Sequence, residues 1–207
     1  MIVVDIETSG LYPERHGIWQ IGALDYYNPE NTFVEDGRID EEDEITEGAL
    51  KVTGKTEEAL RDLNKQSQRS LMQSFFNWTK TVKIKNAICQ NPVFDIAFIN
   101  YKARKLNVTN DFFHLDSHTP FHYRSFDLHS EAQLKYHQIH RGFLFKESHS
   151  NMGLTNILEF CGIEDKRKEH NALEDAKLTA ECFARIIDGK ALFPEYSQFK
   201  IPIYLAK

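Results

Sequence analysis

Apolar and polar positions alternate in the first part of the chain, where two apolar segments are separated by turn-forming residues. Residues 1–7 and 17–27 are rich in β-branched and aromatic side chains, and Gly10 and Pro13 lie between them. This pattern predicts an N-terminal hairpin of two strands. A third strand is expected near residues 32–38. The acidic run that follows it is most simply a solvated loop.

Helical spacing begins after the acidic run. Thr46 and Thr56 are candidate N-caps of two short helices. Between residues 67 and 82, apolar side chains recur at steps of four, three and four residues, at Leu71, Phe75, Trp78 and Val82. This periodicity predicts one face of a helix about four turns long. A strand is expected over residues 84–90.

The second half of the chain is mainly helical by the same criteria. Further helices are expected over 92–105, 128–138, 153–161 and 172–187. An early sheet followed by alternating helices and a strand predicts an α/β fold, with helices packed against a mixed sheet. A chain of 207 residues that is 41% hydrophobic suits one domain with a sizeable core.

Composition excludes several classes of protein. We find no run of about 18 apolar residues that would span a membrane and no secretory signal, so a cytoplasmic location without membrane association is expected. The three cysteines show no CxxC spacing, which disfavours a disulfide framework or a zinc ribbon and favours reduced core residues. A net charge of −6 disfavours binding of nucleic acid by bulk electrostatics, but allows a local site where metal ions supply positive charge.

Two carboxylates end the first predicted strand, in the stretch IVVDIETSG. Side chains in a strand alternate between faces, so Asp5 and Glu7 are expected on the same side of the sheet. Together they could hold a divalent cation.

Two further aspartates occupy matching places at predicted helix starts. Asn91 and Asn171 are candidate N-caps, and Asp95 and Asp175 each fall at the fourth helical position, with His170 just outside the second cap. The positive end of the helix dipole should keep both aspartates ionised, as a ligand of a hard cation must be. Each residue taken singly has an ordinary structural explanation.

As a set, the motifs DIET, NPVFD and HNALED resemble, in order and spacing, the three motifs of the DEDDh 3′-to-5′ exonucleases, a family that includes bacterial proofreading subunits and RNase T. The segments IWQIGALDY and LTNILEFCGI extend the resemblance along nearly the whole chain. It implies an RNase H-like fold, a mixed central β-sheet flanked by helices, as a single exonuclease domain over 1–207. Gln90 departs from the family, since many members carry histidine there.

The resemblance also implies a chemistry. The four carboxylates Asp5, Glu7, Asp95 and Asp175 would hold two divalent metal ions, Mg²⁺ or Mn²⁺, with Asp5 bridging them. His170 would act as general base toward the attacking water. The enzyme would release nucleoside 5′-monophosphates from single-stranded or frayed 3′ ends, with DNA expected ahead of RNA.

Three alternatives remain open at this point. The chain could be an exoribonuclease of the same family, a non-catalytic module of the same fold docked on a polymerase, or a zinc-dependent regulatory domain. The motifs do not decide the oligomeric state, and a homodimer is compatible with them.

Candidate substrate contacts come from two loops. Thr8 and Leu11 follow the first carboxylate pair, where the resembling enzymes place the terminal nucleotide. The basic residues Lys166, Arg167 and Lys168 precede the histidine and could meet substrate phosphates. A solvated loop explains the basic run equally well.

A histidine-rich insert lies around residues 111–150. His114, His118 and His122 recur at steps of four, so a zinc site is conceivable, but Pro120 interrupts the helix that it would need. Asp127 in the same insert is either a supporting residue of the site or simply an N-cap.

Overall fold

The computed structural model describes residues 1–109, 118–167 and 170–206. Its centre is a five-stranded sheet in the order β3-β2-β1-β4-β5. The strands are β1 (Ile2–Thr8), β2 (Ile18–Asp25), β3 (Asn28–Asp36), β4 (Ala87–Cys89) and β5 (Phe126–Asp127). Strands β1, β2 and β3 are antiparallel, whereas β4 and β5 run parallel to β1. The mixed sheet and the N-terminal hairpin predicted from the sequence are therefore confirmed.

The third strand begins earlier than the sequence predicted. It starts at Asn28 rather than near residue 32, because Asn28 already pairs with Asp25 across the turn. Most of this edge strand is exposed. Its first residues are polar, and a hydrophobic pattern therefore could not reveal them.

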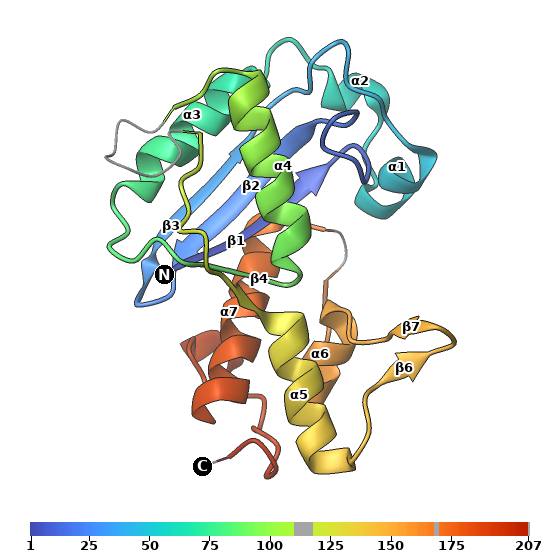
Figure 1. Cartoon of the computed structure of the whole chain (residues 1–207), viewed down its shortest axis with the longest axis vertical. Coiled ribbons are helices and arrows are strands. Elements are labelled where there is room, and N and C mark those ends of the chain that lie inside the picture. Colours follow the sequence, from blue (N-terminus) through green and yellow to red (C-terminus); the bar gives the residue numbers. More distant parts are fainter. Residues whose placement is uncertain (110–117, 168–169, 207) are drawn as a thin grey trace.

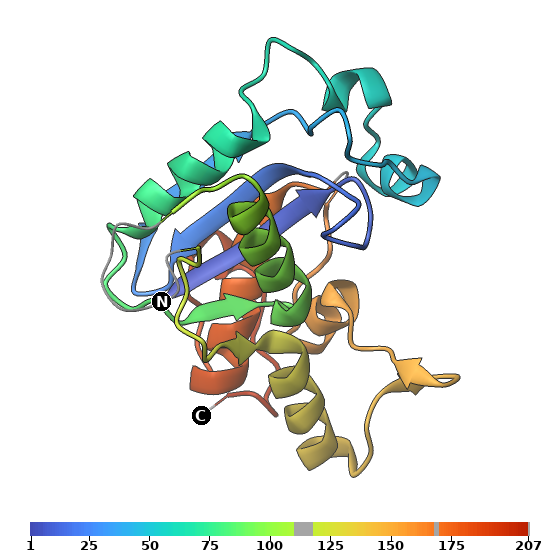
Figure 2. The ribbon, with the colours of Figure 1, turned by 45° about the horizontal axis from the view of Figure 1, so that its top comes forward.

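Helices cover both faces of the sheet (Figure 1, Figure 2). Helices α3 and α4 lie on one face and α7 on the other. The helices are α1 (Glu47–Thr53), α2 (Glu57–Leu60), α3 (Gln68–Thr79), α4 (Pro92–Lys105), α5 (Leu128–His140), α6 (Leu154–Phe160) and α7 (Ala172–Asp188), with a short 3₁₀ turn η1 (Pro194–Tyr196). A small hairpin of β6 (Phe145–Lys146) and β7 (His149–Ser150) projects beside α5 and α6 (Figure 1).

Capping residues start the helices where the sequence predicted. The side chains of Thr46 and Thr56 accept the backbone N–H groups of Ala49 and Ala59, as expected of N-caps. Helix α3 ends at Thr79 rather than at Val82. A turn in which the Val82 N–H donates to the Thr79 carbonyl replaces the last helical turn, and Val82 still reaches the core.

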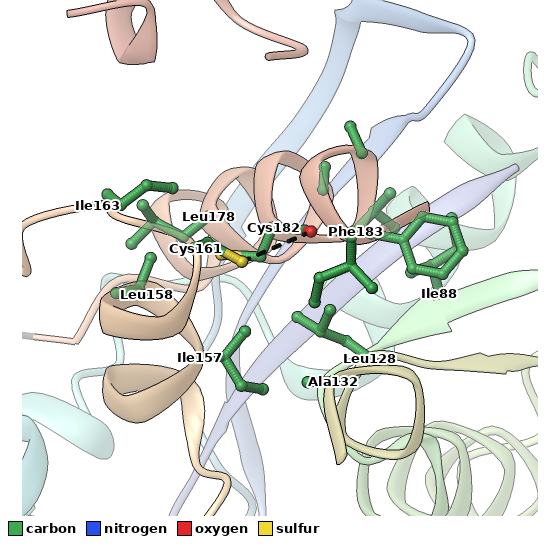
Figure 3. Close-up of a cluster of buried hydrophobic side chains, with 14 of the residues drawn as sticks. Ile88, Leu128, Ala132, Ile157, Leu158, Cys161, Ile163, Leu178, Cys182 and Phe183 are labelled. Atoms are coloured by element: carbon green, nitrogen blue, oxygen red, sulfur yellow. Dashed lines mark hydrogen bonds between the residues drawn. The ribbon is translucent and has the colours of Figure 1, made fainter. Parts of the chain in front are cut away.

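Alternation along β1 divides the core into two clusters. Ile2 and Val4 pack against α3 and α4, whereas Val3 packs with the cluster around α7. Figure 3 shows part of this second cluster, in which Cys161 and Cys182 are buried and the Cys161 thiol lies 3.9 Å from the Cys182 carbonyl oxygen. All three cysteines are free and buried, as the sequence predicted.

The described part of the histidine-rich insert is built into the fold rather than around a metal. Leu128 and Ala132 of α5 join the α7 cluster. Residues 118–125 form no helix, and His114 lies outside the described residues. Within the described part of the insert, no three histidine, cysteine or carboxylate side chains lie close enough together to share an ion. The zinc interpretation therefore has no support there.

A buried ion pair joins α4 to the loop before α1. The Lys102 ammonium lies 2.5 Å from Asp43, and both side chains are almost completely buried. Asp43 also accepts a hydrogen bond from Gln68 at the start of α3. This contact fixes the helix that carries Asp95.

Among the helices that the structure describes, none is long and apolar enough to cross a membrane.

Replacing Lys102 with methionine should destabilise the protein by about 3 kcal/mol, because buried Asp43 would lose its closest cation and keep only the more distant, partly exposed Lys105. Urea unfolding followed by circular dichroism measures this loss. Lys105→Met is the comparison, since Lys105 is partly exposed, pairs with exposed Glu42 at 3.2 Å and lies farther from Asp43, at 3.7 Å, so its loss should cost about 1 kcal/mol or less. Equal effects of the two substitutions would contradict a structural role for the buried pair.

Candidate active site

The two carboxylates of β1 line one cleft together with residues from α6, α7 and the loop between them. The cleft measures about 300 Å³, and its lining includes Asp5, Glu7, Gln90, Leu154, Thr155, Arg167, His170 and Asp175. Asp5 and Glu7 therefore share a side of the sheet, as their spacing predicted. Ligand atoms of Glu7, His170 and Asp175 all lie within 4.8 Å of one another.

Asp95 reaches the same place from the other face of the sheet. It is buried in the first turn of α4, and the backbone N–H of Ile6 on β1 donates to its carboxylate. Pro92 occupies the start of the helix, as expected. Asn91 does not cap with its side chain, contrary to our prediction, because its backbone is left-handed with φ of 91°.

Asp127 ties the insert to this turn. Its carboxylate accepts the backbone N–H of His129 as the N-cap of α5, and also the N–H of Asn91 at 3.2 Å. It is therefore both an N-cap and a support for the turn that leads into α4.

The start of α7 places the histidine beside an aspartate. Asn171 caps the helix by accepting the N–H of Glu174, as the sequence predicted. His170 Nδ1 lies 3.1 Å from Asp175 Oδ2, and Asp175 is buried while His170 is partly exposed. The imidazole therefore sits between an anchoring carboxylate and solvent.

Crowding and burial make the carboxylates hard to ionise together. Loss of hydration raises the pKa of Asp5 well above its usual range, and repulsion from Asp95, Asp175 and Glu7 adds to this shift. Burial, followed by repulsion from Asp175 and Asp95, raises the pKa of Glu7 to about 8. Burial also raises the pKa of Asp95 to about 7 and outweighs the hydrogen bonds that lower it. Without bound cations, the helix dipole therefore does not by itself hold the pKa of Asp95 in its ordinary range.

This donor set fits divalent cations. Carboxylate oxygens are the ligands that Mg²⁺ and Mn²⁺ prefer, and four carboxylates meet where their own charges repel. Cations would remove both the repulsion and the unfavourable burial of negative charge. The raised pKa values of Asp5, Glu7 and Asp95 are thus an observation on this chain that agrees with a metal centre.

Arg167 brings a positive charge into the cleft. Its guanidinium donates to Asp175 Oδ1 at 2.9 Å and pairs with Asp165, and its side chain is 12% exposed. Thr155 on α6 accepts a further hydrogen bond from it. Lys166 instead points to Glu164 and the ring of Phe199. Lys168 lies outside the described residues, so its predicted role is not tested.

A second, more apolar cleft adjoins the first through Glu7. It measures about 380 Å³ and is lined by Thr8, Leu11 and nine other residues, among them Thr46, Val52 and Phe94. The predicted contacts Thr8 and Leu11 therefore lie in one hollow. The contributions of α1 and of Phe94 were missed in the sequence, because nothing in their spacing links them to the carboxylates.

Comparisons with known proteins agree with this arrangement. The model of the exonuclease family RNase T matches residues 2–183. The 3′-5′ DNA exonuclease Cap18 of Escherichia coli is 28% identical over 194 residues, covering 90% of this chain and 90% of that protein. The PolC-type DNA polymerase III of Caldanaerobacter subterraneus subsp. tengcongensis is 26% identical over 187 residues, covering 90% of this chain but only 11% of the polymerase.

Among solved structures, the nuclease domain of 3′hExo, a DEDDh family member bound to rAMP, superposes with a TM-score of 0.63 at 18% identity, covering 97% of this chain and 94% of that one. The RNase H-like fold expected from the sequence is confirmed by this likeness. The chain belongs to the RNase T family of exonucleases.

The raised pKa values predict how stability depends on pH. In the unfolded chain Asp95 and Glu7 have ordinary pKa values of 3.8 and 4.5, so the folded protein binds these protons more tightly. Their contribution to stability is complete below about pH 4 and is lost as the pH rises through about 7 and about 8. Without metal, the melting temperature should therefore fall over this interval.

Thermal melts in EDTA and in Mn²⁺ across this pH range measure the effect. Mn²⁺ should raise the melting temperature most at the alkaline end, where the ligands are ionised. Asp95→Asn should flatten the slope seen in EDTA, because the amide does not ionise. A slope that this substitution leaves unchanged would show that the ionisation of Asp95 does not cause the fall in melting temperature.

Proposed function

We propose that this chain is a metal-dependent 3′-to-5′ exonuclease that hydrolyses phosphodiester bonds at the 3′ end of single-stranded nucleic acid. The products would be nucleoside 5′-monophosphates. The observation that carries the proposal is that Asp5, Glu7, Asp175 and His170 line one cleft, with Asp95 close enough to repel Asp5 and Glu7. Membership of an exonuclease family supports the same proposal.

The four carboxylates would hold two divalent ions, Mg²⁺ or Mn²⁺. When bound, such ions make a water more acidic and neutralise the charge that grows on the phosphate. Asp5 is suited to the central position, since it interacts with each of the other three carboxylates. Asp95 and Asp175 approach it from helices on opposite faces of the sheet.

His170 would accept the proton of the attacking water. Its Nδ1 faces Asp175, and a hydrogen bond from an Nδ1–H to that carboxylate leaves Nε2 free of a proton and able to act as the base. Asp175 would thus orient the imidazole in addition to holding metal. The exposed side of His170 gives water access to the ring.

The apolar cleft beside Glu7 would receive the terminal base. Leu11 is 70% exposed and can pack on a base, and the backbone around Thr8 lies next to the carboxylates. DNA is favoured as the substrate because the similar proteins include a DNA exonuclease and a DNA polymerase. For the same reason, we propose a DNA polymerase as a partner of this chain.

Arg167, which pairs with Asp175 in the structure, would also bind a phosphate of the substrate. Bound cations would compete with the Arg167 guanidinium for Asp175 and free its Nη1 to meet a phosphate of the substrate strand, while Asp165 continues to hold the rest of the group. We propose that Arg167 is the substrate contact of the basic segment, because it lies in the cleft while Lys166 points to Glu164.

The direct test uses single-stranded DNA labelled at either end and an RNA of the same sequence, incubated with Mn²⁺ or with EDTA. Mononucleotides should leave from the 3′ end only with metal, and Asp5→Ala should abolish their release while weakening Mn²⁺ binding in calorimetry. The ratio of the rates on DNA and RNA gives the sugar preference. Absence of release from every substrate would favour a non-catalytic binding module.

His170→Ala should lower kcat by about 10²–10⁴-fold, because the water would lose its proton acceptor. Mn²⁺ affinity should change far less than in Asp5→Ala. Rapid-quench kinetics together with calorimetry separate the two effects. Full activity of the variant would remove His170 from the mechanism.

Arg167→Gln should raise KM by about 10-fold or more, as expected for a lost charge-assisted hydrogen bond to phosphate, while Mn²⁺ binds at least as tightly as in the wild type. Lys166→Gln is the matched control and should leave KM nearly unchanged, since Lys166 is an exposed partner of Glu164. If both substitutions raised KM equally, the effect would come from general charge rather than from a contact.

A further inference from the structure

A glutamine of strand β2 binds the start of α7. Gln20 Oε1 accepts the backbone N–H of Ala172 at 2.8 Å, and the contact is buried. Ala172 is the first residue of α7 and lies between His170 and Asp175. The first N–H groups of a helix have no partner within the helix, so Gln20 supplies one from a neighbouring strand.

Gly22 sets how closely the helix approaches the same strand. A Cβ atom at Gly22 would lie 2.0 Å from the Leu173 nitrogen and 2.1 Å from the Ala172 carbonyl carbon. Both are backbone atoms, which cannot swing aside. The first turn of α7 therefore rests directly on the β2 backbone, while Gln20 fixes its position along the strand.

The other end of the Gln20 amide is fixed by β3. Its Nε2 donates to Asp36 Oδ1 at 2.7 Å, and Asp36 is the cross-strand neighbour of Gln20. Because a carboxylate only accepts, the amide nitrogen must face Asp36 and the amide oxygen must face Ala172. Asp36 thus orients the group that anchors the helix.

The same two positions of β2 lie opposite the carboxylates of β1. Gln20 pairs with Glu7, and Gly22 pairs with Asp5. The strand that holds α7 is therefore locked in register with the strand that carries half of the acidic set. Asp36, Gln20 and Ala172 form a continuous chain of contacts from the sheet edge to the helix.

We propose that Gln20 is a positioning residue of the exonuclease, which fixes His170 and Asp175 relative to Asp5 and Glu7 through the Ala172 N–H. It touches neither metal nor substrate in this proposal. A displacement of about 1 Å in a catalytic group can cost about 10²-fold in rate. The inference rests on the proposed hydrolysis for its kinetic test, and on metal binding for an independent one.

Gln20→Ala should lower kcat by about 10-fold to 10²-fold with little change in KM, because the groups that act on the scissile bond move while the base cleft does not. Mn²⁺ should bind more weakly in calorimetry, since Asp175 is displaced. Gln66→Ala is the matched control. Gln66 also donates to β3, at Glu35 and the Asp36 carbonyl, but does so from the loop before α3.

A reversed pair distinguishes positioning from general stability. Gln20→Glu alone loses the donor to Asp36 and sets two carboxylates against each other, so kcat should fall. In the double variant that combines Gln20→Glu with Asp36→Asn, the new amide at position 36 can donate to the new carboxylate at position 20, whose other oxygen accepts the Ala172 N–H. The formal charge of the pair is unchanged, and kcat and Mn²⁺ affinity should return to within about 3-fold of the wild type, a residual of well under 1 kcal/mol.

The measurements distinguish a positioning role of Gln20 from a purely stabilising one. If Gln20→Ala lowers only the melting temperature, as Gln66→Ala does, while kcat and Mn²⁺ affinity of the folded protein stay unchanged, the proposal is wrong. Failure of a folded double variant to recover would also overturn it. If Gln20→Ala does not fold, the single and double glutamate variants give the same answer. A wild type that binds Mn²⁺ but releases no nucleotide would refute the proposed function alone, since calorimetry still tests the placement of Asp175.

Discussion

Repulsion among four carboxylates in a poorly hydrated place is the constraint on which the rest of the structure depends. Glu7, Asp95 and Asp175 are buried, and loss of hydration followed by repulsion from these three carboxylates raises the pKa of Asp5. Left free, such groups would move apart or take up protons. The fold prevents separation because β1 lies at the centre of the sheet, with α4 and α7 packed on opposite faces. Each acidic helix is then fixed to a strand through the backbone, Asp95 by the Ile6 N–H and α7 by Gln20.

Local rules were enough to predict much of this arrangement. Strand alternation placed Asp5 and Glu7 on one side, since a period of two residues is a property of any extended backbone. The N-caps Thr46, Thr56 and Asn171 were found because a capping side chain bonds within its own first turn. The order of the acidic motifs then implied the fold and the exonuclease family, and the family match confirmed both.

Features that depend on distant parts of the chain could not be predicted in this way. The left-handed backbone at Asn91 arises where its N–H meets Asp127, far along the sequence. The raised pKa of Asp95 could not be foreseen because the helix dipole is a local effect, whereas burial is set by the whole site. Gln20 looked like an ordinary strand residue, since its partner Ala172 lies 152 positions away. Sequence reasoning thus found the acidic groups but not what holds them in register.

Charge balance connects the resting site to its proposed use. A chain with a net charge of −6 gains little from approaching a polyanion, and its acidic cleft would repel one. The Arg167 guanidinium neutralises part of the charge of Asp175. Divalent ions would do this more completely and release Nη1 of the guanidinium for a phosphate. Mutual repulsion of the carboxylates would therefore make substrate binding depend on metal, so that an acidic protein could act on nucleic acid without a broad basic surface.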